Sequence, residues 1–269
     1  MEDKKTKGDI APIIKNKFPA APSVFSPSAL LREARRQKGL ATANVPSVCI
    51  LDPDGDILRR LKKTQQAQPL ETWPCYHTVL YTFSLAGETV GIIGCAVGAS
   101  FAVLIAEELF ASGCRHLLSV TSAGQIVAPN PPPYFVVIDR ALRDEGTSYH
   151  YAAPSEFAEA DSHLVATVAK ALRDKGLAAL IGSSWTTDAP FRETAEAIEA
   201  ARAKGILAVE MEAAALYTFA RARGVSILCL AHVTNTMGLA ERDFEKGESD
   251  GATDALHVLE IATKAMRSG

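Results

Sequence analysis

Short apolar runs alternate with longer helix-like segments along most of this chain, and this alternation constrains the fold more than any other feature. Most of the helix-like segments end before a glycine, which closes a helix at little conformational cost. Strands are predicted over 48–51, 79–83, 90–93, 117–120, 134–138, 178–183 and 226–234, and helices over 101–112, 162–175, 192–204, 211–223 and 253–266. This order predicts an α/β fold of a single domain, with a mixed, largely parallel central β-sheet flanked by helices on both faces.

The first 44 residues differ in composition from the rest of the chain. Residues 1 to about 25 are polar and then proline-rich, which predicts a mobile arm. Ser26 precedes a proline and predicts the cap of a short helix over 29–36 that ends near Gly39. The chain has 269 residues, of which 48% are hydrophobic, so it can bury a full core. We therefore predict an arm with a short helix over 1–44 and one α/β domain over 45–269.

Charge and cysteine usage narrow the environment in which the protein works. The net charge of −3 gives no electrostatic case for binding nucleic acid or an anionic membrane. The five cysteines are scattered and show no metal-ligand spacing, which favours reduced thiols and no structural metal. No apolar run marks a signal peptide or approaches a membrane span. These observations predict a cytoplasmic protein without a metal.

Two carboxylates flank a methionine at Glu210, Met211 and Glu212, between an apolar strand-like approach and an alanine-rich helix. In an extended segment, residues two apart point the same way. A carboxylate at a helix start is also stabilised by free backbone N–H groups. Two such acceptors suit neighbouring hydroxyls, such as the cis-diol of a ribose. The spacing is equally compatible with a helix cap followed by a solvated glutamate.

This run resembles the V-E-M-E-A signature of the nucleoside phosphorylase superfamily, which covers purine nucleoside and uridine phosphorylases and hydrolytic nucleosidases. Other segments agree with the family in the right order, and the likeness runs from about Val45 to the C-terminus. Residues 54–59 are similar to the family's early G-D-P-x-R loop, 94–100 to its glycine loop and 119–124 to its central strand end. Residues 143–151 and 185–192 resemble two stretches of the uridine-phosphorylase-like branch. The glycine loop alone would be weak evidence, whereas the Glu-Met-Glu run is fairly specific.

The resemblance implies that a ribosyl group passes from a nucleobase to phosphate or to water through an oxocarbenium-like transition state. Glu212 is then expected to accept hydrogen bonds from the 2′ and 3′ hydroxyls, with Met211 packed on the sugar face and Glu210 in support. Glu212 is thus one of two expected catalytic residues. The alternative for Met211 is core packing near a helix start.

For phosphate, the resemblance implies binding by Gly55, Arg59 and Ser122. This chain departs from the family here, because Ser119 stands where phosphorylases usually place an arginine. A second arginine, lent by a neighbouring subunit, is also absent near Tyr76. One arginine with backbone donors holds an anion more weakly than a bidentate cluster does. The alternative for Arg59 is a cation on a solvated helix face.

The second expected catalytic residue is Asn235, which follows a buried strand as the family's base-contacting Asp or Asn does. An amide donates a hydrogen bond to a leaving base but supplies no proton as an acid. A pyrimidine or a 6-oxopurine, which leaves readily as an anion, therefore fits it better than adenine.

Further base contacts are expected from Trp185, Phe191 and Arg192. For Trp185, ordinary core packing is an equally good interpretation. His77, Tyr149 and His150 are candidates for the sugar 5′ end, with a structural role as the alternative for each.

These expectations favour a nucleoside phosphorylase that uses inorganic phosphate as co-substrate and no cofactor. A hydrolytic nucleosidase on the same fold and a non-catalytic nucleoside-binding protein remain as alternatives. A dinucleotide-binding enzyme is disfavoured because residues 94–98 lack the G-x-G-x-x-G spacing. Family active sites borrow residues from a neighbouring subunit, and Trp73–His77 lies where that occurs. A homo-oligomer is therefore expected, either a dimer or a hexamer of dimers.

Overall fold

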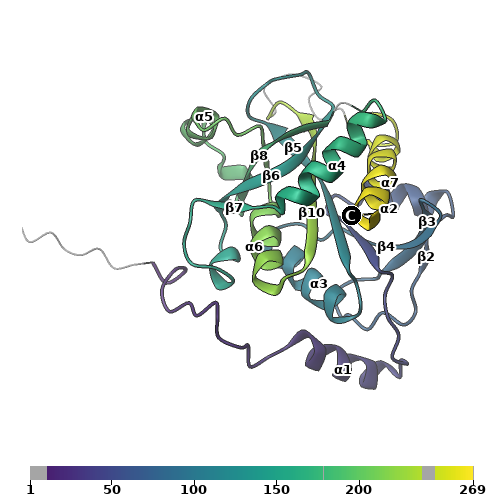
Figure 1. Cartoon of the computed structure of the whole chain (residues 1–269). Coiled ribbons are helices and arrows are strands. Elements are labelled where there is room, and N and C mark those ends of the chain that lie inside the picture. Colours follow the sequence, from purple (N-terminus) through teal and green to yellow (C-terminus); the bar gives the residue numbers. More distant parts are fainter. Residues whose placement is uncertain (1–10, 178, 238–245, 269) are drawn as a thin grey trace, which may run out of the picture.

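The computed structural model describes residues 11–177, 179–237 and 246–268 (Figure 1). The helices are α1 (Pro27–Lys38), α2 (Asp56–Lys63), α3 (Ala99–Ala111), α4 (Ser162–Asp174), α5 (Ala195–Ala203), α6 (Ala213–Arg223) and α7 (Ala252–Ser268), with 3-10 turns η1 (Ser148–His150) and η2 (Pro190–Arg192). The strands are β1 (Val48–Asp52), β2 (Gln68–Pro69), β3 (Tyr81–Leu85), β4 (Glu88–Gly94), β5 (His116–Gln125), β6 (Tyr134–Asp144), β7 (Phe157–Glu159), β8 (Ala179–Thr187), β9 (Ala208–Glu210) and β10 (Ser226–Asn235).

The strands form one mixed sheet in the order β10-β6-β8-β9-β5-β1-β4-β3-β2, with β7 paired to β6. Strand β10 also pairs in parallel with β5, so β5, β9, β8, β6 and β10 close into a ring. Register shifts within β10 and β6 accompany this closure, as expected where strands bend. The mixed sheet was predicted, whereas its closure was not.

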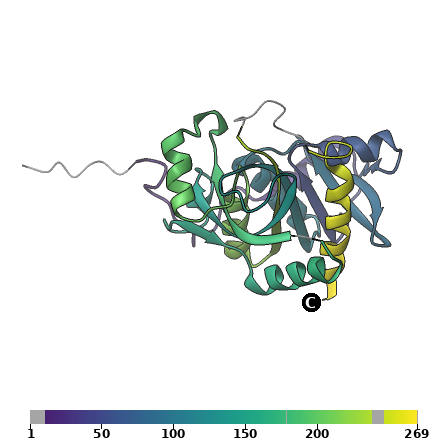
Figure 2. The ribbon, with the colours of Figure 1, turned by 90° about the horizontal axis from the view of Figure 1, so that it is seen from above.

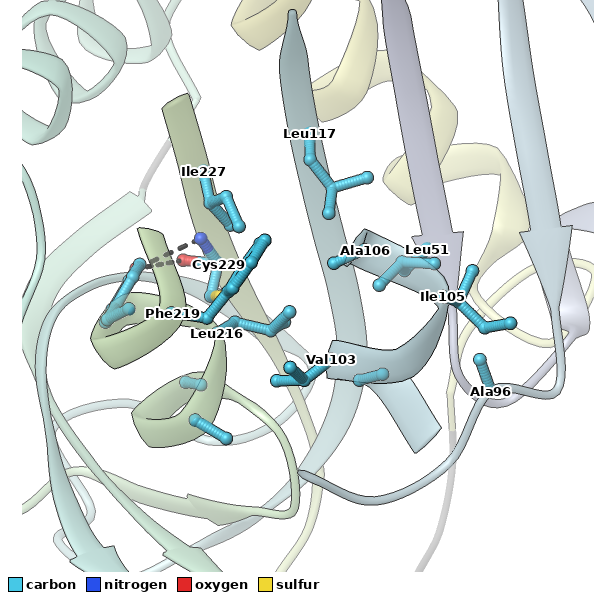
Figure 3. Close-up of a cluster of buried hydrophobic side chains, with 14 of the residues drawn as sticks. Leu51, Ala96, Val103, Ile105, Ala106, Leu117, Leu216, Phe219, Ile227 and Cys229 are labelled. Carbon is cyan, nitrogen blue, oxygen red and sulfur yellow. Dashed lines mark hydrogen bonds between the residues drawn. The ribbon is translucent and has the colours of Figure 1, made fainter. Parts of the chain in front are cut away.

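Helices cover both faces of the sheet, as the sequence predicts. Figure 3 shows one face, where Val103 of α3 and Leu216 of α6 gather over Leu117 and Ile227 of the sheet. The core on the other face includes side chains of α2, α4 and α7. Helices α4 and α7 lie side by side there (Figures 1 and 2). The α/β architecture with a central sheet is therefore confirmed.

Local signals explain where most elements begin and end. Asp161 accepts hydrogen bonds from two backbone N–H groups at the start of α4, and Gly224 ends α6 with φ of 64°. The helix predicted over 192–204 begins later, because the Thr194 hydroxyl caps α5 by accepting from the Ala197 N–H. The helix predicted from Met211 likewise begins only at Ala213. This short delay leaves Met211 and Glu212 at the corner between β9 and α6.

Among the helices of the described ranges, none combines sufficient length with a sufficiently apolar composition to cross a membrane.

Candidate active site

Glu212 lies at the corner between β9 and α6 and is almost fully buried, with 1% of its surface exposed. Its Oε1 accepts a hydrogen bond of 2.7 Å from the Gly98 N–H, and its Oε2 accepts one of 3.3 Å from the Met211 N–H. Gly98 caps the start of α3. The carboxylate thus joins the Glu-Met-Glu corner to the glycine loop, although these two segments lie far apart in the sequence.

Glu210 holds this corner in shape. Its Oε1 accepts from the hydroxyls of Ser184 and Thr186 at 2.9 and 2.5 Å, and its Oε2 accepts from the N–H groups of Glu212 and Ala213, both at 2.7 Å. All four bonds are buried, and two of them satisfy donors at the start of α6. Both oxygens of Glu210 are therefore used by the protein itself, which suits a supporting role.

The two buried carboxyl groups raise each other's cost of ionisation. Burial raises the pKa of Glu212 to about 8, with a further increase from the charge of Glu210. The hydrogen bond from the Gly98 N–H acts in the opposite direction. Burial also raises the pKa of Glu210, against the hydrogen bonds that it accepts. The pair can therefore retain a proton near neutral pH, which a set of isolated surface carboxylates does not.

Asn235 ends β10 beside this corner. It is paired in the sheet with Gly124, which also pairs with Val209 of β9. A methyl group on Gly124 would overlap the sulfur of Met237 and lie 3.3 Å from Asn235 Oδ1, so a larger residue there would displace the Met237 side chain. The Met237 N–H donates to Asn235 Oδ1 at 3.0 Å, whereas within the described ranges Asn235 Nδ2 makes two long contacts of 3.4 Å, to the Ala123 carbonyl and the Thr234 hydroxyl. The amide N–H groups are therefore the part of Asn235 that a ligand can engage.

The residues expected to bind phosphate also meet at this end of the sheet. Gly55 adopts φ of 75° and begins α2, and a methyl group on it would lie 2.6 Å from Cys95 Sγ. Ser122 donates from its N–H and its hydroxyl to the Asp54 carboxylate, at 2.7 and 2.6 Å. Arg59 is exposed and paired with Asp56. The structure thus brings Gly55, Arg59 and Ser122 together. The donor groups of Ser122 are hydrogen-bonded to the Asp54 carboxylate, and the Arg59 guanidinium is paired with the Asp56 carboxylate.

Sequence reasoning did not single out Lys246 or Asp52, which complete this charged cluster. Lys246 Nζ lies 2.6 Å from Asp56 Oδ2 and 3.6 Å from Asp54 Oδ1. Asp52 is buried at the end of β1, and this burial raises its pKa to about 7. Asp52 stands in the same short acidic run as the quoted motif and was detectable, but the sequence around Lys246 carries no comparable signal.

His232, to which no role is assigned from sequence, lies behind the cluster and is stacked on Phe135. Burial lowers its pKa to about 4, so the ring is neutral at physiological pH. With Asp52, Asp54 and Lys246 it lines a cavity of about 20 Å³, room for roughly one water molecule.

The three expected base contacts lie in different surroundings. Trp185 is 4% exposed and packs in a core cluster with Ile126 and Val209. Its indole N–H donates to Asp144 Oδ2 at 3.0 Å. Phe191 and Arg192 lie in η2, where the Phe191 side chain is 97% exposed. The geometry of Trp185 is that of a core residue, whereas Phe191 and Arg192 project from the surface.

The candidates for the sugar 5′ end are also spread. Tyr149 is half-buried, with its hydroxyl donating to the Arg143 carbonyl at 3.1 Å. His150 is exposed and lines a pocket of about 820 Å³ with the N-terminal arm and Asp188. His77 is exposed beside Tyr76. Of these, His150 alone lines that pocket.

The model of the phosphorylase superfamily matches residues 47–265. A protein named purine nucleoside phosphorylase DeoD-type from Bacillus cereus (strain ZK / E33L) is 27% identical over 202 residues, covering 73% of this chain and 85% of that protein. Its counterpart from Bacillus thuringiensis (strain Al Hakam) matches with the same identity and coverage.

Among solved structures, uridine phosphorylase from Vibrio fischeri ES114 has a similar fold. The TM-score is 0.69 at 20% sequence identity, covering 83% of this chain and 93% of that chain. At this identity the likeness concerns the fold alone. The family match, in contrast, spans most of the chain and includes the Glu-Met-Glu corner, the glycine loop and Asn235. This chain therefore belongs to the phosphorylase superfamily, as its sequence motifs predict.

Proposed function

We propose that this chain is a pentosyltransferase that cleaves the N-glycosidic bond of a nucleoside. The observation that carries the proposal is the corner at Glu212, where a buried carboxylate bridges to Gly98 beside Asn235. An acceptor for hydroxyls and a donor for a base are thereby combined at one end of the sheet. The matched relatives named purine nucleoside phosphorylase support this choice.

In this proposal, Glu212 accepts hydrogen bonds from the 2′ and 3′ hydroxyls of the ribose, and Met211 packs on the sugar. The positive charge that develops on the sugar is stabilised by the same carboxylate when it is ionised. Glu210 is a positioning residue, since its four hydrogen bonds fix the start of α6. Binding of the diol favours the ionised form of Glu212, because donors to a carboxylate lower its pKa.

Asn235 is proposed to donate from its Nδ2 to the departing base. As the bond between C1′ and the base nitrogen breaks, the electron pair moves to the base, and an amide stabilises that negative charge without giving up a proton. Pyrimidines and 6-oxopurines are therefore the proposed bases. Phe191 and Arg192 are proposed as further base contacts from their exposed turn.

The proposed acceptor is inorganic phosphate, held by Gly55, Arg59 and Ser122. An oxygen of phosphate would attack C1′ and give ribose 1-phosphate with the free base. A second candidate is hydrolysis, which is favoured by one observation: both Ser122 donors are occupied by Asp54. Water needs fewer charged partners than phosphate does, so this arrangement is compatible with it.

A homo-oligomer in the cytoplasm is proposed as the working form. The segment that precedes β3 exposes the apolar side chains of Tyr76 and Val79, which a second subunit could cover. All five cysteines are free thiols, which suits a reducing compartment. Sedimentation equilibrium at micromolar concentration tests the assembly, and an active monomer would contradict it.

The function is tested by incubating the protein with uridine, thymidine, inosine and guanosine, with and without phosphate. Release of free base supports cleavage, and the sugar product distinguishes the two acceptors. A pentose 1-phosphate formed only with phosphate supports phosphorolysis, whereas free pentose formed at the same rate in both conditions supports hydrolysis; the pentose is 2-deoxyribose for thymidine and ribose for the other nucleosides. Failure to release base from any nucleoside would contradict the proposed function.

A further inference from the structure

Ser122 offers two hydrogen-bond donors at the site assigned to the acceptor, and one carboxylate takes both. Its N–H donates to Asp54 Oδ2 at 2.7 Å, and its hydroxyl donates to Asp54 Oδ1 at 2.6 Å. These are short, charge-assisted bonds in a bidentate arrangement. A phosphate held by Ser122 would need the same two donors. The Asp54 carboxylate therefore lies where an edge of that anion would lie.

The cations at this place are engaged in the same way. Lys246 Nζ lies 2.6 Å from Asp56 and 3.6 Å from Asp54, and Arg59 is paired with Asp56. Asp52 adds a third carboxyl group close by, since its charge interacts with those of Asp54 and Asp56. An entering phosphate would meet two cations that are already paired and would add negative charge beside carboxylates. Like charges at such short range repel strongly in a partly buried site.

The backbone limits how this arrangement can change. Strands β1 and β5 are held in parallel register, with Leu51 opposite Ser119, so β1, which leads into the turn of Asp54, and β5, which carries Ser122, cannot slide apart. Release of Ser122 must come from rotation of the Asp54 side chain or of the turn at Gly55. Asp54 itself is partly exposed, which leaves room for such a rotation.

We propose that Asp54 selects the acceptor by competing with phosphate for Ser122 and Lys246. Phosphate binds after the Asp54 carboxylate has been displaced, and water meets no such competition. The inference rests on the proposed cleavage of nucleosides, because it assigns Ser122 to the acceptor site. It makes Asp54 a specificity-determining residue that does not itself touch the sugar.

A purely structural role for Asp54, as a clamp for the turn between β1 and α2, predicts a different result. If Asp54 served only the turn, its removal would loosen Ser122 and weaken phosphate binding or leave it unchanged. If Asp54 competes, its removal frees the two Ser122 donors and takes away one of the two carboxylates near Lys246, which strengthens phosphate binding. The affinity for inorganic phosphate therefore separates the two roles.

The experiment measures the dissociation constant of inorganic phosphate by calorimetry, without nucleoside, for the native protein and for Asp54→Asn and Asp54→Ala. Both variants are expected to bind phosphate at least about tenfold more tightly. Asparagine preserves the shape of aspartate without its charge, so it tests the competition even if the alanine variant does not fold. Asp174→Asn is the control, because Asp174 forms an exposed pair with Lys170.

Adding Ser122→Ala to Asp54→Ala should restore weak binding, because the hydroxyl donor is then lost. An unchanged or weaker affinity for phosphate in both Asp54 variants would overturn the proposal. Nucleoside cleavage is measured separately on the same proteins. Absence of cleavage in the native protein would count against the proposed function, whereas the phosphate affinities would still decide the role of Asp54.

Discussion

The Glu212 carboxylate accepts a hydrogen bond of 2.7 Å from the Gly98 N–H, across the gap between the start of α6 and the start of α3. This bond ties together two segments that resemble family motifs and lie far apart in the sequence. In this bond, a backbone N–H group at the start of α3 points towards a carboxylate. This orientation is favourable because the N-terminus of a helix stabilises negative charge. Changes near either residue are therefore expected to affect the whole site.

Replacing Asn235 by aspartate is expected to move base preference towards 6-aminopurine nucleosides. A protonated carboxyl group can donate a proton to a ring nitrogen, whereas the native amide can only donate a hydrogen bond. The measurement is kcat/KM for uridine, thymidine, inosine, guanosine and adenosine on both proteins. Adenosine as the best substrate of the native protein would remove Asn235 from its proposed role.

Stability of the protein without substrate is expected to fall as the pH rises from 6.5 to 8. Burial raises the pKa of Glu212 to about 8 in the folded protein, against 4.5 for an ordinary glutamate, so the folded state binds more protons in this range. The free energy of unfolding then decreases with pH, by at most about 1.4 kcal/mol per pH unit for one group. His232 has the opposite effect, mainly below pH 7, because its pKa is lowered from the ordinary 6.5 to about 4.

Urea unfolding at several pH values measures this dependence. The variant Glu212→Gln cannot ionise and should show a flatter profile between pH 6.5 and 8. Asp52, with a pKa of about 7, contributes mainly below this range. Parallel profiles for the native protein and the variant would show that Glu212 does not retain its proton.

Replacing Gly251 by alanine is expected to destabilise the protein and disturb the charged cluster. A methyl group there would lie 2.6 Å from the Lys246 carbonyl oxygen and would overlap the His232 ring. Overpacking of this kind costs about 1–3 kcal/mol. Gly176→Ala is a matched control, because Gly176 has φ of 76° against 77° for Gly251 but no atom within 4 Å of an added methyl group.

The two alanine variants separate crowding from backbone strain when their free energies of unfolding are compared. Gly176→Ala carries the strain of a positive φ alone. If Gly251→Ala lowers the free energy of unfolding by no more than Gly176→Ala does, the turn beside Lys246 rearranges freely to accept the methyl group.

Most of the fold could be predicted because the signals are local. The apolar runs, the capping residues and the glycines that end helices each act within a few residues, and they place most elements of the sheet and its covering helices. The ring closure could not be predicted, since it depends on β10 pairing with both β5 and β6. The strands predicted over 117–120 and 134–138 also continue further, to Gln125 and Asp144, into segments with weaker apolar patterns.

At the site, the Glu-Met-Glu run could be recognised from the sequence, because the end of a strand and the start of a helix lie within a few residues of each other there. The contact between Asp54 and Ser122 joins the turn after β1 to strand β5, and no spacing in the sequence indicates it. Ser119 is fully buried between neighbouring strands, so an arginine placed there would meet the core rather than an anion. Phosphate binding can therefore be changed with less disturbance at Asp54, which is partly exposed, than at Ser119.

The central claim, that Glu212 anchors the ribose during cleavage of a nucleoside, is tested most directly by kcat/KM of Glu212→Gln on the best nucleoside. Glutamine keeps the shape of glutamate but loses the charge-assisted hydrogen bonds to the hydroxyls, at a cost of about 1.5–3 kcal/mol in transition-state binding. Glu71→Gln, at an exposed position, is the control. We predict a fall of roughly 10- to 150-fold for Glu212→Gln and no change for Glu71→Gln. An unchanged kcat/KM in the Glu212 variant would contradict the account.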